Sequence, residues 1–279
     1  MLELGAWSFI AVVKMNPWLL LNSGPGAPAF NMALDEALLE AASRQGRPVL
    51  RFYGWTEPAA TFGYFQKYAD VERATPLRPL IRRPTGGGIV PHDADWTYSV
   101  AFPPGHEWHS FRAAESYRRV HEWIQSAFAK LNVATELAPR CKQSVPSSRS
   151  SRREEAPSSS AECGMRNAES KQSLLTSAAT SVLPGQCFAG YQKFDVLWHG
   201  QKIAGAAQRR NKLGLLIQGS VQPPPICLDR TDWQKAMCAV GRGEWGIEWL
   251  DFAPDDALRS RAEDLVRQKY SQMKFIRNR

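Results

Sequence analysis

Apolar residues recur at helical spacing in three stretches of the chain. They predict helices over Asn31–Arg44, Ser110–Leu131 and Asp255–Tyr270, each with one apolar face. Asn31 is a candidate N-cap of the first helix, and Gly46 lies just past its end.

Shorter apolar stretches bounded by turn residues predict strands. In chain order these are Leu19–Leu21, Val49–Tyr53, Ala60–Tyr64, Leu80–Arg83, Trp96–Phe102, Phe194–Trp198, Gln201–Gln208 and Leu213–Val221. The strands Leu80–Arg83 and Trp96–Phe102 flank a run of glycines, so we expect a hairpin around it. Gly63 falls inside a predicted strand, which indicates that another backbone approaches closely there.

The segment from residue 138 to residue 185 differs in composition from the rest of the chain. It is rich in serine, arginine and glutamate and nearly free of aromatic residues. Such a segment buries too little apolar surface to offset the entropy lost on ordering. We therefore predict a disordered insertion over residues 138–185, inside a single domain that spans residues 15–279. Residues 1–14 lack a basic region before their apolar stretch, so we predict no signal peptide. They form an extra N-terminal segment or, if Met15 is the true start, a non-native one.

Composition narrows the class of protein. The 279 residues are 43% hydrophobic and 10% aromatic, which suits a globular core. No run reaches the ~18 apolar residues that a membrane-spanning helix needs. The five cysteines show no paired metal-ligand spacing, and without a secretory signal we expect reduced thiols in the cytoplasm. A net charge of +8 suits an acidic partner. The chain has no basic stripe interleaved with aromatic residues, so nucleic-acid binding is weakly supported.

The stretch Arg82–Asp93 gathers chemically active residues. Its three consecutive glycines can take positive φ, and their N–H groups can form an anion-binding concavity. Arg82 and Arg83 can direct guanidinium groups at a phosphate or carboxylate. His92 and Asp93 offer a titratable or orienting pair. A hairpin turn flanked by solvated arginines explains the same residues equally well.

This stretch resembles the signature loop of the lipoate–protein ligase and octanoyltransferase family. Four further blocks fit the family in the same order, and the resemblance covers roughly Trp18 to Gln222. These blocks are Ala29–Leu38, Arg51–Trp55, Gly63–Gln66 and Lys202–Gln208. The resemblance implies the mixed α/β (α+β) fold of the biotin/lipoyl protein ligase catalytic domain, with a largely antiparallel sheet flanked by helices.

The resemblance also implies an activity. Members of the family transfer a lipoyl or octanoyl group to a lysine on a lipoyl domain, either of 2-oxoacid dehydrogenase complexes or of the glycine cleavage H protein. In the family the lysine that matches Lys202 contacts the acyl carbonyl, where a cation stabilises developing negative charge. Without the motif, a lysine near a strand end would be an ordinary surface charge. The implied acyl- or adenylate-binding residues are Arg83, Thr85, Gly86, Gly87, Gly88, His92, Gly205 and Ala206.

Two enzyme interpretations compete, and the first is the favoured one. In it, acyl carrier protein is the donor, Cys187 takes the octanoyl group as a thioester, and no cofactor is needed. Cys187 lies close upstream of the Lys202 strand, as does the acyl-accepting cysteine in the Cys-dependent octanoyltransferases. Thiolates are good acyl acceptors, and a nearby lysine favours the thiolate form. Considered alone, a single cysteine is more often a small core residue.

In the second interpretation the protein is an ATP-dependent lipoate–protein ligase that forms lipoyl-adenylate with Mg²⁺. Gly88 favours it, because the Cys-dependent transferases tend to carry arginine there. Asp195 matches a metal- or nucleotide-associated aspartate of the ligases, so it is a metal ligand under this interpretation only. The sequence predicts no C-terminal accessory domain of the kind many ligases have, which favours the transferase. A third interpretation, a non-catalytic basic binding protein, is opposed by the retained Lys202, Arg83 and glycines.

Overall fold

The computed structural model of the protein describes residues 16–139, 188 and 190–278. The predictions for residues 1–14 lie outside this part of the chain. So does the predicted insertion, except for residues 138 and 139, and so does Cys187.

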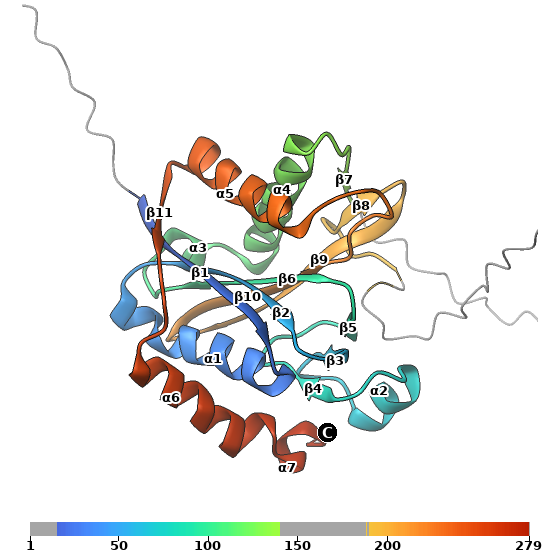
Figure 1. The fold of residues 1–279 in the computed structure, drawn as a ribbon, viewed down its shortest axis with the longest axis vertical. Coiled ribbons are helices and arrows are strands. Elements are labelled where there is room, and N and C mark those ends of the chain that lie inside the picture. Colours follow the sequence, from blue (N-terminus) through green and yellow to red (C-terminus); the bar gives the residue numbers. More distant parts are fainter. Residues whose placement is uncertain (1–15, 140–187, 189, 279) are drawn as a thin grey trace, which may run out of the picture. The chain divides into compact units, whose positions relative to one another are not determined.

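A large sheet runs through the centre of the described residues (Figure 1). In spatial order its strands are β11 (Ile247–Asp251), β1 (Asn16–Gly26), β2 (Val49–Trp55), β6 (Trp96–Phe102), β10 (Gly214–Val221), β9 (Gln201–Asn211), β8 (Val196–Trp198) and β7 (Glu136–Leu137). Strand β1 is parallel to both of its neighbours, and every other neighbouring pair is antiparallel. The prediction of a largely antiparallel sheet is therefore confirmed.

A second, smaller sheet carries the glycine loop. Its order is β4 (Leu80–Arg82), β3 (Ala59–Phe62) and β5 (Val90–His92), with β3 in the middle. Strand β4 is parallel to β3, which the chain leaves through α2 (Tyr68–Ala74), and β5 is antiparallel to β3. The glycine loop therefore joins the two outer strands of this sheet. The predicted hairpin between residues 80–83 and 96–102 is wrong, because β4 and β6 belong to different sheets.

Helices cover both faces of the large sheet (Figure 1). On one face lie α1 (Pro28–Gln45) and α6 (Asp256–Leu265), the latter continued by a π-helical turn (Val266–Tyr270). On the other face lie α4 (Ala113–Lys130) and α5 (Arg230–Trp245), and two short helices, α3 (Glu107–Ser110) and α7 (Met273–Ile276), complete the set. No helix in the described part of the chain is both long and apolar enough to cross a membrane.

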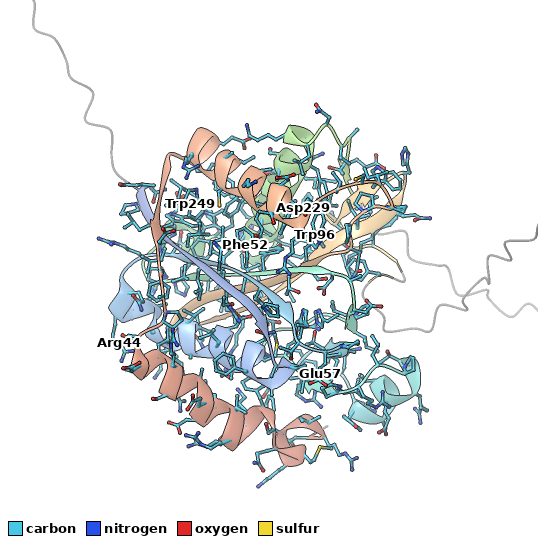
Figure 2. All side chains as sticks on the ribbon, viewed as in Figure 1. Arg44, Phe52, Glu57, Trp96, Asp229 and Trp249 are labelled. Carbon is cyan, nitrogen blue, oxygen red and sulfur yellow. The ribbon has the colours of Figure 1, made fainter. Side chains whose placement is uncertain are left out.

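The predicted helices are present, with two changes at helix starts. Helix α1 begins at Pro28, three residues before the predicted Asn31. The helix predicted from Ser110 begins at Ala113, because Phe111 has an extended backbone that ends α3. Helix α5 was not predicted; it begins after Asp229, which Figure 2 labels. The Asp229 carboxylate accepts hydrogen bonds from backbone N–H groups in the first turn of the helix.

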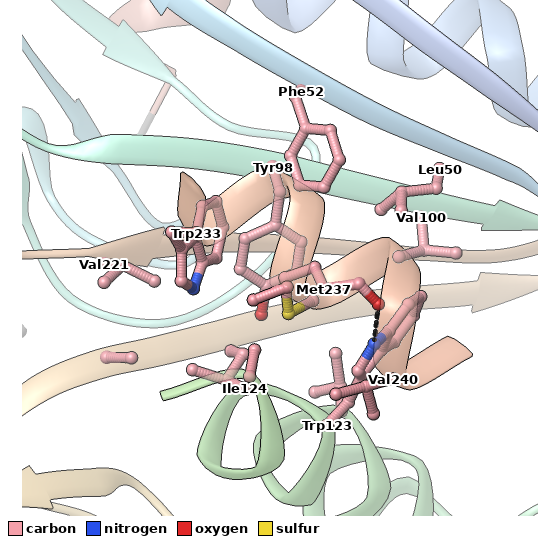
Figure 3. Packing of buried hydrophobic residues seen from close by; sticks show 14 of the residues in the cluster. Leu50, Phe52, Tyr98, Val100, Trp123, Ile124, Val221, Trp233, Met237 and Val240 are labelled. Atoms are coloured by element: carbon pink, nitrogen blue, oxygen red, sulfur yellow. Dashed lines mark hydrogen bonds between the residues drawn. The ribbon is translucent and has the colours of Figure 1, made fainter. Parts of the chain in front are cut away.

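The larger core lies between the sheet and helices α4 and α5. Figure 3 shows Phe52 and Tyr98 of the sheet beside Trp233 and Met237 of α5. The rings of Phe52 and Trp233 pack edge to face, with centroids 5.5 Å apart. The indole N–H of Trp123 donates to the Met237 carbonyl oxygen at 2.8 Å. That bond lets a large indole on α4 be buried without losing its hydrogen bond, and it fixes α4 against α5.

An ion pair in the protein interior fixes α1 to the sheet. Asp35 of α1 and Arg51 of β2 are 2.7 Å apart, with side chains 0% and 1% exposed. The Asp35 carboxylate also accepts hydrogen bonds from Tyr53, Ser99 and Gln218. One carboxylate therefore ties the helix to three neighbouring strands.

The Asn31 side chain binds Arg51 of this ion pair and does not cap the helix. The predicted N-cap role is wrong, because α1 already begins at Pro28 and Ala27 is its cap. The Asn31 side chain donates to the Gly54 carbonyl at 2.8 Å and accepts from Arg51 at 2.7 Å. Its amide therefore satisfies part of the buried guanidinium.

We expect Asp35→Ala to lower the free energy of unfolding by about 3–5 kcal/mol, because it leaves the Arg51 charge buried without a counter-ion. Denaturant titrations measure the loss. The matched control is Asp70→Ala, which removes an exposed pair with Arg73. An exposed pair contributes at most about 1 kcal/mol. Equal losses in the two variants would contradict the assigned importance of burial.

Candidate functional site

A mostly apolar pocket lies among the two sheets, α1 and the glycine loop. Its lining residues are Met32, Tyr53, Thr61, Arg83, Gly87, Val90, His92, Thr97, Gly205, Ala206, Ala207, Gln218, Gly219 and Ser220. Five of the residues predicted to bind an acyl or adenylate group are among them: Arg83, Gly87, His92, Gly205 and Ala206. Thr85, Gly86 and Gly88 belong to the glycine loop but do not line the pocket.

The glycine loop passes directly over the end of β3. Gly87 has a φ of +88°, a conformation that favours glycine. A Cβ atom at Gly63 would lie 2.0 Å from the Gly87 carbonyl oxygen. The predicted close approach of another backbone at Gly63 is therefore confirmed, and the approaching backbone is the glycine loop.

Arg83 holds the glycine loop from within. Its guanidinium donates to the carbonyl oxygens of Gly86 and Gly88, each at 2.8 Å. It also donates to the Thr61 hydroxyl at 2.9 Å, on the neighbouring strand. The carbonyl oxygens of the loop therefore turn toward Arg83. A role of Arg83 in binding an acyl or adenylate group stays a prediction.

Arg82 connects the same loop to the C-terminal segment. It is 2% exposed, and its guanidinium donates to the carbonyl oxygens of Tyr64, Gln66 and Ile276. These contacts are to the chain's own backbone, whereas the sequence suggested a guanidinium directed at a ligand anion.

His92 is oriented by a carboxylate, but not by the predicted one. Its Nδ1 lies 2.9 Å from Asp95 Oδ2, and its Nε2 lies 2.7 Å from the Thr61 hydroxyl. Asp93 is exposed and accepts a hydrogen bond from the Ala94 N–H. The pairing of His92 with Asp93 is therefore wrong, because the chain turns after His92 and brings Asp95 back to it.

A hydrogen-bond network makes this polar set compatible with an apolar pocket. Asp95 Oδ2 also accepts from the hydroxyls of Thr97 at 2.9 Å and Ser220 at 2.7 Å. The indole of Trp55 donates to Thr97 at 2.8 Å and its ring stacks on His92. Because these polar atoms bind one another, carbon atoms form most of the pocket wall.

Gln218 links the pocket to the buried ion pair. Its amide oxygen accepts from the Thr85 hydroxyl at 2.8 Å. Its amide nitrogen donates to Asp35 at 2.7 Å and lies 3.4 Å from the Met32 sulfur. Thr85 therefore acts on the site through Gln218, since it positions a side chain that lines the pocket.

Lys202 lies against the pocket wall at Gly205. A Cβ atom on Gly205 would lie 2.6 Å from Lys202 Cε and 2.7 Å from its Nζ. The ammonium therefore occupies the space that glycine leaves open, beside a residue that lines the pocket. The Lys202 side chain is 4% exposed, and its Nζ lies 5.3 Å from the centroid of the Phe188 ring.

Asp195 holds this ammonium. Its fully buried carboxylate lies 2.8 Å from Lys202 Nζ through Oδ2, which also accepts from the Gln192 N–H at 2.7 Å. The other oxygen, Oδ1, accepts from the Tyr117 hydroxyl. A metal-binding role for Asp195 stays a prediction. Its oxygens already bind an ammonium and two hydrogen-bond donors. These partners do not form the set of oxygen ligands that Mg²⁺ requires.

Two other buried groups are affected by this ion pair, and burial is the larger cause of the pKa shift in each. Burial, together with the positive charge of Lys202, lowers the pKa of His121 to about 3. Burial, together with the negative charge of Asp195, raises the pKa of Tyr98. Among the described residues, no group of three or more His, Cys, Asp or Glu side chains could hold a metal ion.

Several residues of the site had no role in the sequence analysis. They are Met32, Tyr53, Thr61, Asp95, Thr97, Tyr117, Gln218 and Ser220. For Gln218 and Ser220 a signal was present, because two polar residues alternate along an otherwise apolar strand. For Tyr117 no signal was present, because its partner Asp195 lies far away in the sequence.

We expect Gly63→Ala to lower the free energy of unfolding by about 1–3 kcal/mol, because the new methyl group meets the Gly87 backbone, which cannot yield as a side chain does. The control is Gly243→Ala in α5, where a Cβ meets nothing within 4 Å. That variant should be neutral or more stable by up to about 1 kcal/mol. Denaturant titrations compare the two, and a neutral Gly63→Ala would contradict the close approach.

The fold is shared with solved lipoate–protein ligases. A putative lipoate protein ligase from Thermoplasma acidophilum with bound lipoic acid superposes with a TM-score of 0.66 at 18% identity, covering 95% of this chain and 100% of that one. A lipoate-protein ligase A bound with ATP gives a TM-score of 0.64 at 18% identity, covering 94% and 96%. At this identity the likeness establishes the fold alone, and the predicted mixed α+β architecture is confirmed.

Sequence comparison gives nearer relatives. Octanoyltransferase LipM of Geobacillus kaustophilus is 34% identical over 213 residues, which are 73% of this chain and 64% of the relative. Octanoyltransferase LipM of Bacillus subtilis is 33% identical over 214 residues, covering 75% and 66%. The chain thus spans about two thirds of the length of these relatives. The family model of the lipoyl protein ligase A/B catalytic domain matches residues 27–222. The chain therefore belongs to the lipoyl protein ligase A/B catalytic domain family.

Proposed function

We propose that this protein is a cytoplasmic acyltransferase that moves an octanoyl group from acyl carrier protein to a lysine of a lipoyl domain. The observation that carries the proposal is the Lys202 ammonium, held by Asp195 beside an apolar pocket. The relatives named octanoyltransferase LipM support the choice of acyl group and reaction.

The lining of the pocket suits the hydrocarbon part of such a substrate, although the cavity of about 30 Å³ must widen to admit an eight-carbon chain. Burial of each CH₂ group contributes about 0.8 kcal/mol to binding. Apart from Asp95 Oδ1, which is not part of the lining, the polar atoms around the pocket bind one another and offer an alkyl chain few competing contacts. An octanoyl chain therefore gains affinity from the pocket without breaking the network around Asp95.

Lys202 is suited to act on the carbonyl of that substrate. With the alkyl chain in the pocket, a carbonyl at the Gly205 wall comes close to Lys202 Nζ. When a nucleophile adds to the carbonyl carbon, negative charge develops on its oxygen. A fixed cation there stabilises the charge and lowers the barrier.

Cys187 is the proposed nucleophile. Its thiolate attacks the carbonyl carbon of octanoyl–acyl carrier protein, and the carrier leaves as a thiol after taking a proton. The uncharged amine of the acceptor lysine then attacks the enzyme thioester, releasing the Cys187 thiolate and one proton. Phe188 supports this assignment, because it follows Cys187 in the sequence and its ring centroid lies 5.3 Å from Lys202 Nζ. Neither step requires a cofactor, because the thioester is already activated.

Charge supports an acidic acceptor. The chain carries a net charge of +8, and opposite charge on a partner speeds association. The proposed acceptors are the lipoyl domains of 2-oxoacid dehydrogenase complexes or the glycine cleavage H protein. A solved structure of the same fold comes from a study of a bipartite lipoate protein ligase and its E2 lipoyl domain from Thermoplasma acidophilum.

A second candidate is an ATP-dependent lipoate–protein ligase, which would use ATP and Mg²⁺. Gly88 favours it, because the third glycine leaves the loop backbone accessible to a phosphate. The contacts of Asp195 with Lys202 and Tyr117 favour a role in holding the lysine over a role in holding a metal.

We expect wild-type protein incubated with octanoyl–acyl carrier protein to gain the mass of one octanoyl group, labile to hydroxylamine. The adduct should disappear in Cys187→Ala, because the thioester forms on that sulfur. The matched control is Cys227→Ala, which removes an exposed free thiol of the described chain and should leave the adduct intact. Intact-protein mass spectrometry measures the mass gain of all three proteins.

The same proteins separate the alternatives. Loss of the adduct in Cys227→Ala instead would move the nucleophile to that thiol. Formation of lipoyl- or octanoyl-adenylate from free acid, ATP and Mg²⁺, unchanged in Cys187→Ala, would make the protein a ligase. No transfer to a lipoyl domain by either route would contradict both enzyme proposals.

We expect Gly205→Ala to lower kcat by about tenfold or more, because the added methyl group displaces the Lys202 ammonium from its place at the pocket wall. Its free energy of unfolding should fall by about 1–3 kcal/mol, since the ammonium must move within its buried ion pair with Asp195. Gly243→Ala serves as the control and should keep wild-type kcat. Full activity in Gly205→Ala would contradict the assigned position of Lys202.

A further inference from the structure

Tyr117 contacts the partner of Lys202 although it does not line the pocket. It lies on α4, and its hydroxyl donates to Asp195 Oδ1. Lys202 and the Gln192 N–H bind the other carboxylate oxygen, Oδ2. The two oxygens of Asp195 therefore have separate duties: one faces the lysine and the other faces Tyr117.

This division restricts the rotation of the carboxylate. A carboxylate bound only through Oδ2 can turn about its Cβ–Cγ bond and carry the lysine with it. A donor on Oδ1 fixes the plane of the group and, through it, the direction in which Oδ2 receives the ammonium. Tyr117 supplies that donor from a helix, whereas Asp195 lies just before the short strand β8.

The helix segment that carries Tyr117 is held in place by packing. Helix α4 is fixed to α5 by the hydrogen bond from Trp123 to Met237 at 2.8 Å. One turn along α4 from Tyr117, His121 is fully buried, and the two rings pack with centroids 4.2 Å apart and an interplanar angle of 72°. The position of the hydroxyl is therefore determined by the packed core.

We propose that Tyr117 is a positioning residue for Lys202 and acts through Asp195. Tyr117 does not contact the substrate in this proposal. It orients the Asp195 carboxylate, which in turn orients the Lys202 ammonium. Its hydroxyl therefore affects the acyl carbonyl only indirectly. The effect of Tyr117 on catalysis rests on the proposed acyl transfer, whereas its effect on the position of Lys202 does not.

Tyr117→Phe tests the proposal because it removes the hydroxyl and keeps the ring against His121. We expect kcat of octanoyl transfer to fall by between about ten- and a hundredfold, in the range expected for loss of a hydrogen bond to a charged group. KM for the acyl donor should stay within about twofold, since the pocket does not include Tyr117.

Tyr98→Phe is the matched control. It removes another buried tyrosine hydroxyl near Asp195, one that has no hydrogen-bond partner among the described residues. We expect kcat and KM within about twofold of wild type, because removing an unsatisfied hydroxyl breaks no contact. Equal losses of kcat in Tyr98→Phe and Tyr117→Phe would reduce Tyr117 to a packing residue and overturn the proposal.

A double-mutant cycle tests whether Tyr117 acts through Asp195. In an Asp195→Asn background, Tyr117→Phe should change kcat by less than about twofold, because the group it orients is already altered. The same loss in both backgrounds would show that Tyr117 acts independently of Asp195 and would contradict the proposal.

Crystal structures of wild type and Tyr117→Phe test the positioning without using activity. In the variant we expect the distance from Lys202 Nζ to Asp195 Oδ2 to exceed the roughly 4 Å limit of a salt bridge, or Lys202 to occupy more than one conformer. An unchanged pair would overturn the inference. If the wild type transfers no acyl group, the proposed function fails while this comparison still decides the role of Tyr117.

Discussion

The buried ion pair between Asp35 and Arg51 is the constraint on which the site depends. Two charges removed from water are tolerated only when their remaining hydrogen-bonding capacity is also satisfied. Asp35 meets this condition by accepting bonds from three strands, so α1 and those strands have one mutual arrangement. Gln218 extends the constraint, because its amide binds Asp35 on one side and Thr85 of the glycine loop on the other. The position of the loop is therefore tied to the centre of the sheet.

The pocket shows how polar residues can enclose an apolar space. Thr97 and Ser220 donate their hydroxyls to Asp95, and Asp95 in turn orients His92. All of these bonds involve Oδ2 of Asp95, whereas its Oδ1 is buried without a hydrogen-bond partner among the described residues, which is costly. Because the other polar atoms bind one another and Asp95 does not line the pocket, the pocket wall is mostly apolar. The same bonds make the wall rigid, since a side chain cannot turn into the lumen without breaking one of them.

Much of the fold could be predicted from periodicity, but pairing and long-range contacts could not. Amphipathic helices and apolar strands carry local signals, so most of them were found within a few residues of their bounds. The hairpin prediction failed because neighbours along the chain need not pair, and β4 pairs with the earlier strand β3. Helix α5 escaped prediction because Gly241 and Gly243 interrupt its pattern. The sequence suggested that His92 pairs with the adjacent Asp93, although the direction of a side chain in a turn does not follow from adjacency, and Asp95 is the actual partner.

The sequence pointed to single candidate residues of the site, but not to the side chains that hold them in place. Lys202 and Gly205 stand in one short motif, and the structure places the ammonium in the space beside the glycine. The partners of Lys202 come from other elements and have no local signal. Yet they are what make a lysine possible there. An ammonium buried beside an apolar pocket would lose its proton or turn to solvent unless an anion compensated it. Asp195 supplies the anion, and Tyr117 restricts how that anion can turn. The charge is therefore both tolerated and fixed. A fixed charge stabilises a developing oxyanion without first having to reorganise, which is the advantage that a buried lysine has over an exposed one.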